Sequence, residues 1–347
     1  MRHDYHKVTD LGEDALIARI ASRIGPASGD EMWSGDDAAV VGSPGSRLLY
    51  TTDLMVEGVD FDVAYASGHD VGWKAMAVNV SDIAAMGGRP THAVATLGLR
   101  LDVLVAFVDA VVDGMLEAAD RWGAALVGGD ISRASEISVG IAMAGAAGDR
   151  VVTRGGARPG DAICVTGTLG GAAGGLIALR RGMAGPGPTE GHAFSATLRE
   201  AFGRLAERHL RPVARLDEGR ALAAGAATAM IDLSDGLAPD LYRLLEASGV
   251  GGTIAPDAVP VDPDVHTLAG AITDDTLDPT RLALIGGEDF ELLFTVPPDR
   301  LDDTRAAVTE MGTEVSVLGE VTEGARLMGD RDLSEWKEAG WDHLRTR

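Results

Sequence analysis

The sequence predicts an α/β or α+β fold divided into two domains. Short aliphatic and β-branched runs, typical of strands, occur along the whole chain between longer periodic runs, typical of helices. The chain has 347 residues, well beyond the ~100–150 residues of a common single domain. Glycine occurs 46 times and aromatic residues make up only 4%, which indicates helices packed closely on sheets with many tight turns.

Seven short runs predict strands, because aliphatic and β-branched side chains fit the pleated, half-buried surface of a sheet. These runs are Leu48–Thr52, Thr91–Leu101, Ala124–Val127, Ile137–Ala144, Ala162–Thr166, Ala229–Ile231 and Glu291–Val296.

Three periodic segments predict helices. The first begins at Asp10, where Glu13 completes the spacing of a capping box, and runs to about Arg23. The second has Pro239 in its first turn and then an apolar face. The third, residues 73–87, is apolar nearly all round and is therefore expected to be buried.

The composition changes over residues 145–161, where glycine and arginine cluster. Such a stretch is typical of a loop, so we place the domain boundary there. We expect one domain over residues 1–148 and a second over residues 149–347. The Gly- and Pro-rich segment 182–191 predicts a surface loop between two helices.

The net charge of the chain indicates which classes of ligand it is expected to bind. The formal net charge is −23, and no run rich in Lys or Arg occurs, so we expect no binding to nucleic acid. Acidic clefts suit divalent cations instead. No stretch approaches the ~18–20 apolar residues of a membrane span, and residues 1–10 lack the apolar core of a secretory signal. With Cys164 as the single cysteine, a cytoplasmic protein is expected.

Acidic residues stand beside glycine or hydroxyl residues in six segments, most of them directly after an expected strand. The segments are Gly35-Asp36-Asp37, Thr51-Thr52-Asp53, Asn79-Val80-Ser81-Asp82, Gly128-Gly129-Asp130, Asp232-Leu233-Ser234-Asp235-Gly236 and Gly286-Gly287-Glu288-Asp289. Asp beside Gly is common in turns. Six such segments along one chain favour a functional site, because loops at strand ends are where α/β proteins assemble one.

The segment with Asp82 strengthens this interpretation. Asn79 and Asp82 are three residues apart, on one face of a helix that is expected to be buried. A buried carboxylate is unfavourable unless it is paired or binds a metal. Lys74 is an alternative, purely structural partner. We favour metal ligation, and Asp, Thr, Ser and Asn oxygens are typical of a Mg²⁺ site.

Other chemistries lack their motifs. The sequence has no Cys-x-x-Cys or His-Glu-x-x-His for zinc, no Gly-x-Ser-x-Gly for a serine hydrolase, and no complete P-loop. The glycine run 167–175 either cradles a phosphate at a helix start or allows helices to pack closely. Arg154 is either a phosphate contact or a solvated loop residue. Glu288 and Trp341 are candidate contacts to an organic substrate, with anchoring of the tail as the alternative for Trp341.

These motifs, taken in order, resemble the thiamine-monophosphate kinase family, in the larger group that includes aminoimidazole ribonucleotide synthetase. The similarity extends from Gly12-Glu13 to Trp341-Asp342-His343. Its most diagnostic pieces are Gly-Asp-Asp-Ala-Ala-Val, Thr-Thr-Asp-Leu-Met-Val-Glu-Gly-Val-Asp-Phe, Lys-Ala-Met-Ala-Val-Asn-Val-Ser-Asp-Ile-Ala-Ala-Met-Gly, Val-Gly-Gly-Asp, Ile-Asp-Leu-Ser-Asp-Gly-Leu and Gly-Gly-Glu-Asp-Phe-Glu-Leu.

The resemblance implies transfer of a phosphoryl group from ATP to thiamine phosphate, giving thiamine diphosphate. It implies several Mg²⁺ ions held by Asp37, Thr51, Thr52, Asp53, Asp82, Asp130, Asp232 and Asp235. It implies ATP contacts from Gly129, Asp130, Arg154 and Ser234, and substrate contacts from Glu288, Trp341 and the position of Asp60. The family usually has His at that last position, so the role of Asp60 is open. The resemblance also implies a homodimer formed through the N-terminal sheet, and a C-terminal domain that closes over the nucleotide.

The chemistry of the reaction agrees with an acidic site. A phosphate monoester with a second pKa of ~6 is already mostly dianionic at pH 7, so no general base is required and we assign no catalytic side chain. Metal ions that neutralise two anions suit direct in-line transfer. The alternatives are a ligase similar to aminoimidazole ribonucleotide synthetase and a non-catalytic Mg-ATP sensor. Selenophosphate synthetase and the hydrogenase maturation relative are disfavoured, because each requires a cysteine at a position that lacks one here.

Overall fold

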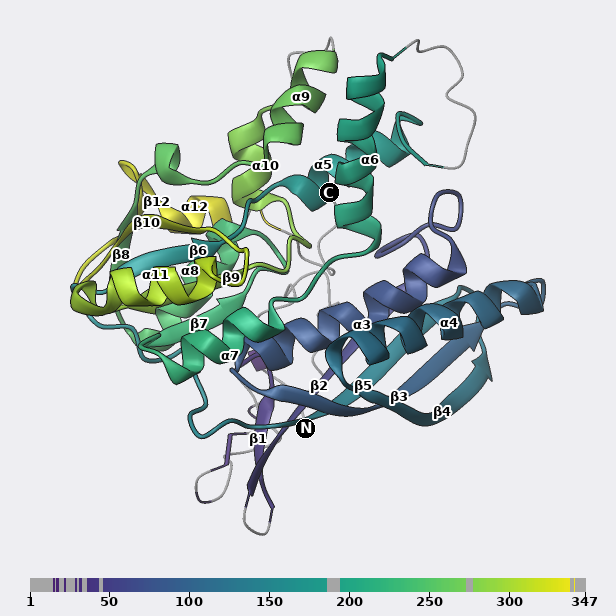
Figure 1. Cartoon of the computed structure of the whole chain (residues 1–347), viewed down its shortest axis with the longest axis horizontal. Coiled ribbons are helices and arrows are strands. Elements are labelled where there is room, and N and C mark those ends of the chain that lie inside the picture. Colours follow the sequence, from purple (N-terminus) through teal and green to yellow (C-terminus); the bar gives the residue numbers. More distant parts are fainter. Residues whose placement is uncertain are drawn as a thin grey trace, which may run out of the picture.

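The computed structural model describes residues 36–43, 46–185, 194–272 and 277–337, with Gly340 and a few isolated positions before residue 33. Most of the helix expected from Asp10 to Arg23 lies outside the described residues, as does Trp341. The described residues form two sheets, each with helices packed against it (Figure 1). The α/β class with two sheet-and-helix units is therefore confirmed.

The N-terminal sheet has five strands in the order β1-β2-β5-β3-β4. The strands are β1 Ala39–Ser43, β2 Ser46–Val56, β3 Arg89–Leu99, β4 Ala125–Arg133 and β5 Ser138–Ala146. Strands β3 and β4 pair in parallel, while the other neighbours are antiparallel. Helices α3 (Gly68–Ala85) and α4 (Val105–Trp122) cover one face of this sheet (Figure 1).

Helix α3 is the buried helix that the sequence predicts, although it begins five residues earlier than the expected segment 73–87. A capping box at Ser67 and Asp70 explains its start, because each side chain accepts a hydrogen bond from a backbone amide of the other residue. Small residues let α4 approach closely. A Cβ atom added to Gly72 would lie 1.9 Å from the Val111 carbonyl oxygen, so a larger residue there would push the helices apart.

The C-terminal sheet has seven strands in the order β12-β11-β8-β10-β6-β9-β7. The strands are β6 Ala162–Thr166, β7 Ala229–Asp232, β8 Gly251–Ile254, β9 Leu292–Val296, β10 Val315–Thr322, β11 Arg326–Met328 and β12 Arg331–Asp332. The helices are α5 Gly171–Arg180, α6 Ala196–Leu210, α7 Leu216–Ala224, α8 Leu237–Ser248, α9 Pro263–Ala271, α10 Pro279–Ile285, α11 Leu301–Thr309 and α12 Leu333–Lys337, with short 3₁₀ turns at Pro256–Ala258 and Pro298–Arg300.

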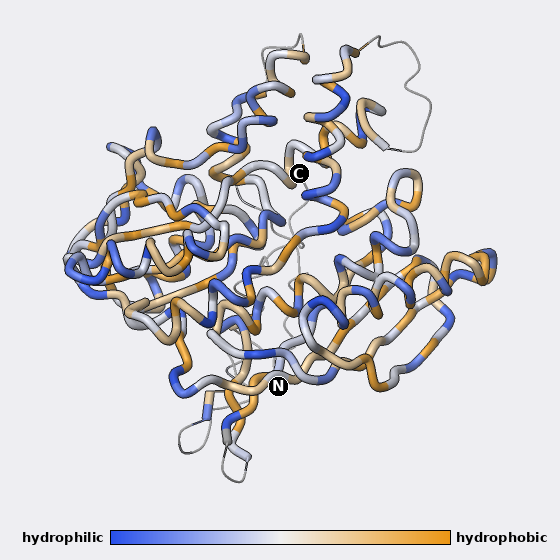
Figure 2. The backbone as a smooth tube through the Cα atoms, in the orientation of Figure 1, coloured by the Kyte–Doolittle hydropathy of each residue, from blue (hydrophilic) through white to orange (hydrophobic). Residues whose placement is uncertain are grey.

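All seven predicted strands are present, and β6 has the predicted bounds. Helix α8 carries Pro239 in its first turn, as predicted. The two halves meet along α3, because Gly219 of α7 lies so near Ala84 that an added Cβ atom would be 2.2 Å from the Ala84 carbonyl oxygen. Hydrophobic stretches follow the strands of both sheets (Figure 2). Among the described residues, no helix is both long and apolar enough to cross a membrane.

Candidate functional site

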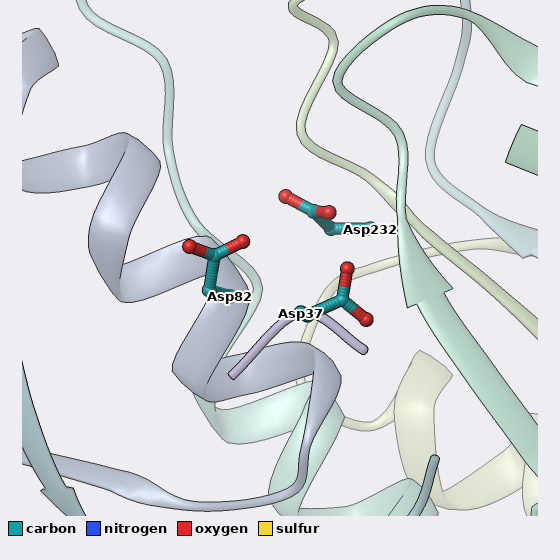
Figure 3. A group of neighbouring side chains, drawn as sticks. All are labelled: Asp37, Asp82 and Asp232. Atoms are coloured by element: carbon teal, nitrogen blue, oxygen red, sulfur yellow. The ribbon is translucent and has the colours of Figure 1, made fainter. Parts of the chain in front are cut away.

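Three carboxylates from distant parts of the sequence meet where the two halves join. Asp37 precedes β1, Asp82 is on α3, and Asp232 ends β7. One oxygen of each lies within 4.8 Å of the others, and the three side chains surround a common space (Figure 3). The structure thus brings together three of the acidic residues that the sequence predicts as metal ligands.

Hydroxyl groups orient two of these carboxylates. The Thr51 hydroxyl on β2 donates a hydrogen bond to Asp82. The Ser81 hydroxyl on α3 donates to Asp232 Oδ2 at 2.6 Å, which links the two halves of the chain. One oxygen of Asp37 is buried and has no hydrogen-bond partner among the described residues. An unsatisfied buried carboxylate oxygen is unfavourable, and its position suits a cation ligand.

The cluster strongly disfavours its own ionisation. Burial and the charges of Asp53, Asp232 and Asp37 raise the pKa of Asp82 well above its usual value. Burial and the charge of Asp37 likewise raise the pKa of Asp232. Like charges in a desolvated site cannot all remain ionised without a compensating cation. The cluster therefore has the electrostatics of a cation-binding site.

Lys74, the alternative structural partner of Asp82, does not supply this positive charge. Eight residues along a helix span ~12 Å, and the Lys74 ammonium contacts Glu288 instead. The nearest described cation is Arg154, whose Nη2 donates to Asp37 Oδ1 at 2.5 Å. The Arg154 amide also donates to Asp36, and burial with the charge of Asp37 raises the pKa of Asp36 to about 7. Arg154 is thus bound to the cluster and is not a solvated loop residue.

A cavity of about 210 Å³ lies next to the cluster, because its lining includes Asp53, whose charge acts on Asp82, and Ser234, which is two residues after Asp232. Five of the predicted site residues line it, namely Asp53, Asp60, Ser234, Asp235 and Glu288. The carboxylate of Asp235 is bound by Arg243 Nη1 at 2.5 Å, and its amide donates to Asp240. Apolar residues such as Val78, Leu176 and Phe290 complete the wall, so one cavity offers both oxygen ligands and an apolar surface.

Glu288 reaches this cavity because its loop is attached to the turn after β7. The Glu288 amide donates to the Ser234 carbonyl at 2.8 Å, and an added Cβ atom on Gly287 would lie 2.4 Å from the same oxygen. Glu288 has φ +70°, a value uncommon for residues other than glycine. Its side chain contacts Lys74 and His209. Burial would raise the pKa of Glu288, but these two partners lower it to about 2.

Asp60 has a structural partner. Its Oδ2 accepts a hydrogen bond from the Val56 amide at 2.7 Å, so the carboxylate fixes the turn that follows β2. A carboxylate is also the wrong charge for a direct contact to phosphate. The cavity contains Lys74 and Arg180 as its cations, and neither belongs to the residues predicted from the sequence.

Three predicted residues lie away from the cluster. Successive strand residues point to opposite faces of a sheet, so Thr52 faces away from Thr51 and its hydroxyl donates to Ile141. Gly129 and Asp130 are on the edge strand β4. The cross-strand register places Gly129 three strands from Asp53, which corresponds to ~14 Å.

The glycine run 167–175 favours the packing alternative. A Cβ atom added to Gly175 would lie 2.0 Å from the Leu205 carbonyl oxygen of α6. The amides of Gly170 and Ala172, at the start of α5, already donate to the Asp289 carboxylate at 2.6 and 3.1 Å. Because Asp289 occupies this helix start, it is not a vacant phosphate cradle.

Sequence reasoning missed His209. Its signal was present, since the buried positions 202, 205, 206 and 209 of α6 have helical spacing and His209 is the one titratable residue among them. No local pattern indicated that His209 contacts Glu288, because Glu288 lies 79 positions further along the chain.

Both halves match known families. Residues 35–147 match the AIR synthase related protein, N-terminal domain, and residues 158–330 match the AIR synthase related protein, C-terminal domain. The thiamine-monophosphate kinase of Aquifex aeolicus is 35% identical over 338 residues, which cover 97% of this chain and 100% of that protein. The chain belongs to the thiamine-monophosphate kinase family. Its relative from Halobacterium salinarum is 37% identical, over 89% of this chain and 94% of the relative.

Solved structures of the thiamine-monophosphate kinase family agree. The structure described as AaThiL complexed with AMPPCP and TMP has a TM-score of 0.84 and 32% identity, and the match covers 98% of this chain and 100% of that one. The hydrogenase maturation protein HypE, in its complex with HypF, has a TM-score of 0.66 at 21% identity, which shows a shared fold alone. The resemblance seen in the motifs is therefore confirmed at the level of the family.

Proposed function

We propose that this chain transfers the γ-phosphoryl group of ATP to thiamine phosphate, giving thiamine diphosphate and ADP. The observation that carries the proposal is the acidic cluster of Asp37, Asp82 and Asp232 beside a cavity that is partly apolar. Relatives that cover nearly the whole chain are thiamine-monophosphate kinases, and one of the similar structures contains AMPPCP and TMP. These similarities support the same donor and acceptor here.

The residues of the cluster fit Mg²⁺, because the donor set consists of hard oxygens and one Asp37 oxygen is buried without a partner. Asp37, Asp82 and Asp232 would hold the ions, with Asp53 and Asp235 at the cavity wall. Bound Mg²⁺ supplies neutralisation of the phosphate charges. Thr51 and Ser81 orient two of the carboxylates. Thr52 and Asp130 remain predictions as ligands, and Gly129 and Ser234 remain predictions as ATP contacts.

Protein side chains position the two substrates and do not take a proton. The acceptor phosphate is already mostly dianionic at pH 7, so it attacks without a general base. Arg154 would contact the ATP phosphates, and the position of its guanidinium at the cluster supports this role. Glu288 remains ionised at neutral pH and faces the cavity, where it suits the cationic organic part of thiamine phosphate. Trp341, outside the described residues, remains a predicted contact to that part.

The arrangement of subunits and domains is part of the same proposal. The face of the N-terminal sheet opposite α3 and α4 carries the exposed apolar side chains Tyr50, Leu54 and Val94. Apolar patches of this kind mark interaction surfaces, which supports a homodimer through this sheet. Residues 1–148 would form this dimer and supply most metal ligands, while residues 149–347 would close over the nucleotide. Use of ATP agrees with the cytoplasmic location predicted from the sequence.

Product analysis tests the function. The purified chain is incubated with ATP and Mg²⁺ and with thiamine phosphate, thiamine or an aminoimidazole precursor as acceptor. We expect ADP and thiamine diphosphate to form in equal amounts, and only with thiamine phosphate. Turnover with the aminoimidazole precursor would instead support a ligase. Binding of ATP without phosphorylation of any acceptor would support a sensor and contradict the proposal.

A further inference from the structure

Glu288 is held from both sides by residues that belong to different halves of the chain. Its Oε1 lies 2.5 Å from the ammonium of Lys74 on α3, and its Oε2 lies 3.1 Å from Nδ1 of His209 on α6. Lys74 also donates to the Asp60 carbonyl at 3.2 Å. One lysine therefore contacts two segments of the cavity wall, one from each half of the chain.

The exposure of the three side chains shows which of them presents a polar group to the cavity. The side chains of Lys74 and His209 are 4% and 3% exposed, whereas that of Glu288 is 29% exposed. A carboxylate has about four acceptor positions, and the contact with Lys74 uses one of them, while Nδ1 of His209 lies close to Oε2 without the angle of a hydrogen bond. The Glu288 carboxylate thus retains acceptor capacity for a ligand, while its two partners lie behind it.

The backbone of Glu288 makes this support necessary. At φ +70° the chain adopts a conformation that residues other than glycine rarely adopt. The hydrogen bond from the Glu288 amide to the Ser234 carbonyl fixes the backbone of the loop, but it does not determine where the side chain points. The contacts with Lys74 and His209 determine that direction. Buried lysine and histidine side chains are unfavourable without such a partner.

We propose that Lys74 and His209 are positioning residues, which hold the Glu288 carboxylate in the orientation that binds the organic part of the acceptor. This inference rests on the proposed function, in which that part is the cationic, amino-substituted heterocycle of thiamine phosphate. Because α3 and α6 come from different halves of the chain, the acceptor site is complete only when the halves have this arrangement. Glu288 contacts the substrate, and the other two residues act through it.

A double-mutant cycle tests the action of Lys74 through Glu288. Lys74→Met and Glu288→Gln are each expected to raise the KM for thiamine phosphate ~10–100-fold, the range typical of losing a hydrogen bond to a charged group, with the KM for ATP nearly unchanged. In the Glu288→Gln background, Lys74→Met should add less than about threefold, because its partner charge is already gone. If Lys74→Met raised the KM for thiamine phosphate by the same factor in the Glu288→Gln background as in wild type, the inference would be overturned.

Substitutions of His209 provide a second, independent measurement. His209→Asn retains an amide donor near the Nδ1 position and should keep the KM for thiamine phosphate within about threefold of wild type. His209→Leu removes the polar contact with the Glu288 carboxylate and should raise that KM ~10-fold. His69→Leu is the matched control, because His69 contacts Glu117 on the surface between α3 and α4 and does not line the cavity. Equal effects of the Asn and Leu variants, or equal rises in the KM of ATP and thiamine phosphate, would contradict a positioning role.

The same assays separate this inference from the proposed function. A wild-type chain that forms no thiamine diphosphate would overturn both. A wild-type chain that turns over, combined with additive variants, would overturn the positioning role alone. Thermal unfolding of each variant verifies that it is folded. If Lys74→Met does not fold, the cycle of His209→Leu with Glu288→Gln gives the same comparison.

Discussion

The site contains two kinds of buried or partly buried carboxylate, and they differ in where their positive charge comes from. Asp82 and Asp232 lie among other carboxylates, and burial with this repulsion raises their pKa values. Glu288 is partly buried, and Lys74 and His209 lower its pKa to about 2. In the first group the single built-in cation Arg154 contacts Asp37, so the remaining carboxylates require positive charge from solution, whereas the second has its cation built into the fold. This difference supports the proposal that the acidic cluster binds metal and that Glu288 binds the organic substrate.

The strongest test of this comparison removes one charge from the acidic cluster. We expect Asp82→Asn to lower kcat by a factor of about 10³ or more, because metal-ion catalysis is worth several kcal/mol and each 1.36 kcal/mol is tenfold in rate. Without metal, the same variant should be more stable than wild type by ~1 kcal/mol or more, because it relieves like-charge repulsion in a desolvated site. Steady-state kinetics and thermal unfolding in EDTA measure the two effects.

The opposite directions of these two effects distinguish a metal ligand from a structural residue. Asp109→Asn, on the exposed surface of α4, is a matched control that should change neither activity nor stability appreciably. If Asp82→Asn destabilised the metal-free protein as well as inactivating it, the carboxylate would have a structural role and the contrast with Glu288 would fail.

A smaller effect concerns pH. In the folded chain the pKa values of Asp36 and Asp240 are raised to about 7, mainly by burial, while in the unfolded chain they are near the ordinary 3.8. Between these values the folded state binds protons that the unfolded state does not, so the stability of the metal-free protein should rise as pH falls from about 8 to about 5. The raised pKa values of Asp82 and Asp232 act in the same direction. The lowered pKa of His209 has the opposite effect on stability, because the unfolded state binds a proton there that the folded state does not.

Thermal unfolding in EDTA over pH 5–8 measures this slope, and the same series in saturating Mg²⁺ is the control. Mg²⁺ binding keeps carboxylates ionised, so the rise toward low pH should be smaller with the metal present. Below about pH 4.5 the stabilising contribution of Glu288 is progressively lost, because its pKa in the folded chain is about 2. Stability that fell steadily from pH 8 to pH 5 in EDTA would contradict the raised pKa values.

The sequence predicted the parts of the molecule that depend on local patterns. Strand β6 and the buried helix α3 were predicted because their residues are apolar with clear periodicity. Strands β1, β8, β10, β11 and β12 were not predicted. Two of them have weak local patterns, because Gly251–Ile254 contains two glycines and Arg326–Met328 is only three residues long. Their pairing depends on contacts across the sheet, which no local pattern contains.

The same limit applies to the site. The motifs indicated Asp37, Asp82 and Asp232, since acidic residues beside strands and in a buried helix have a local signal. They did not indicate which of the neighbouring residues Thr51 and Thr52 would face the cluster, because that depends on which face of β2 meets α3. The contacts of Glu288 were also missed, since Lys74 and His209 come from two helices far away in the sequence.

The smallest effect is expected for substitutions of Asp60. This carboxylate lines the cavity but belongs neither to the acidic cluster nor to the ion pairs of Glu288. Its Oδ2 accepts a hydrogen bond from the Val56 amide, a contact that the carbonyl oxygen of an Asn side chain also makes. Asp60→Asn should therefore change the KM for thiamine phosphate less than about threefold, whereas Asp60→Ala, which loses the acceptor, should destabilise the turn by ~1 kcal/mol. Kinetics with thermal unfolding of both variants measure this. A tenfold or larger change in KM with Asp60→Asn would show that the negative charge itself contacts the substrate, and Asp60 would then join Glu288 as a residue that binds the organic cation.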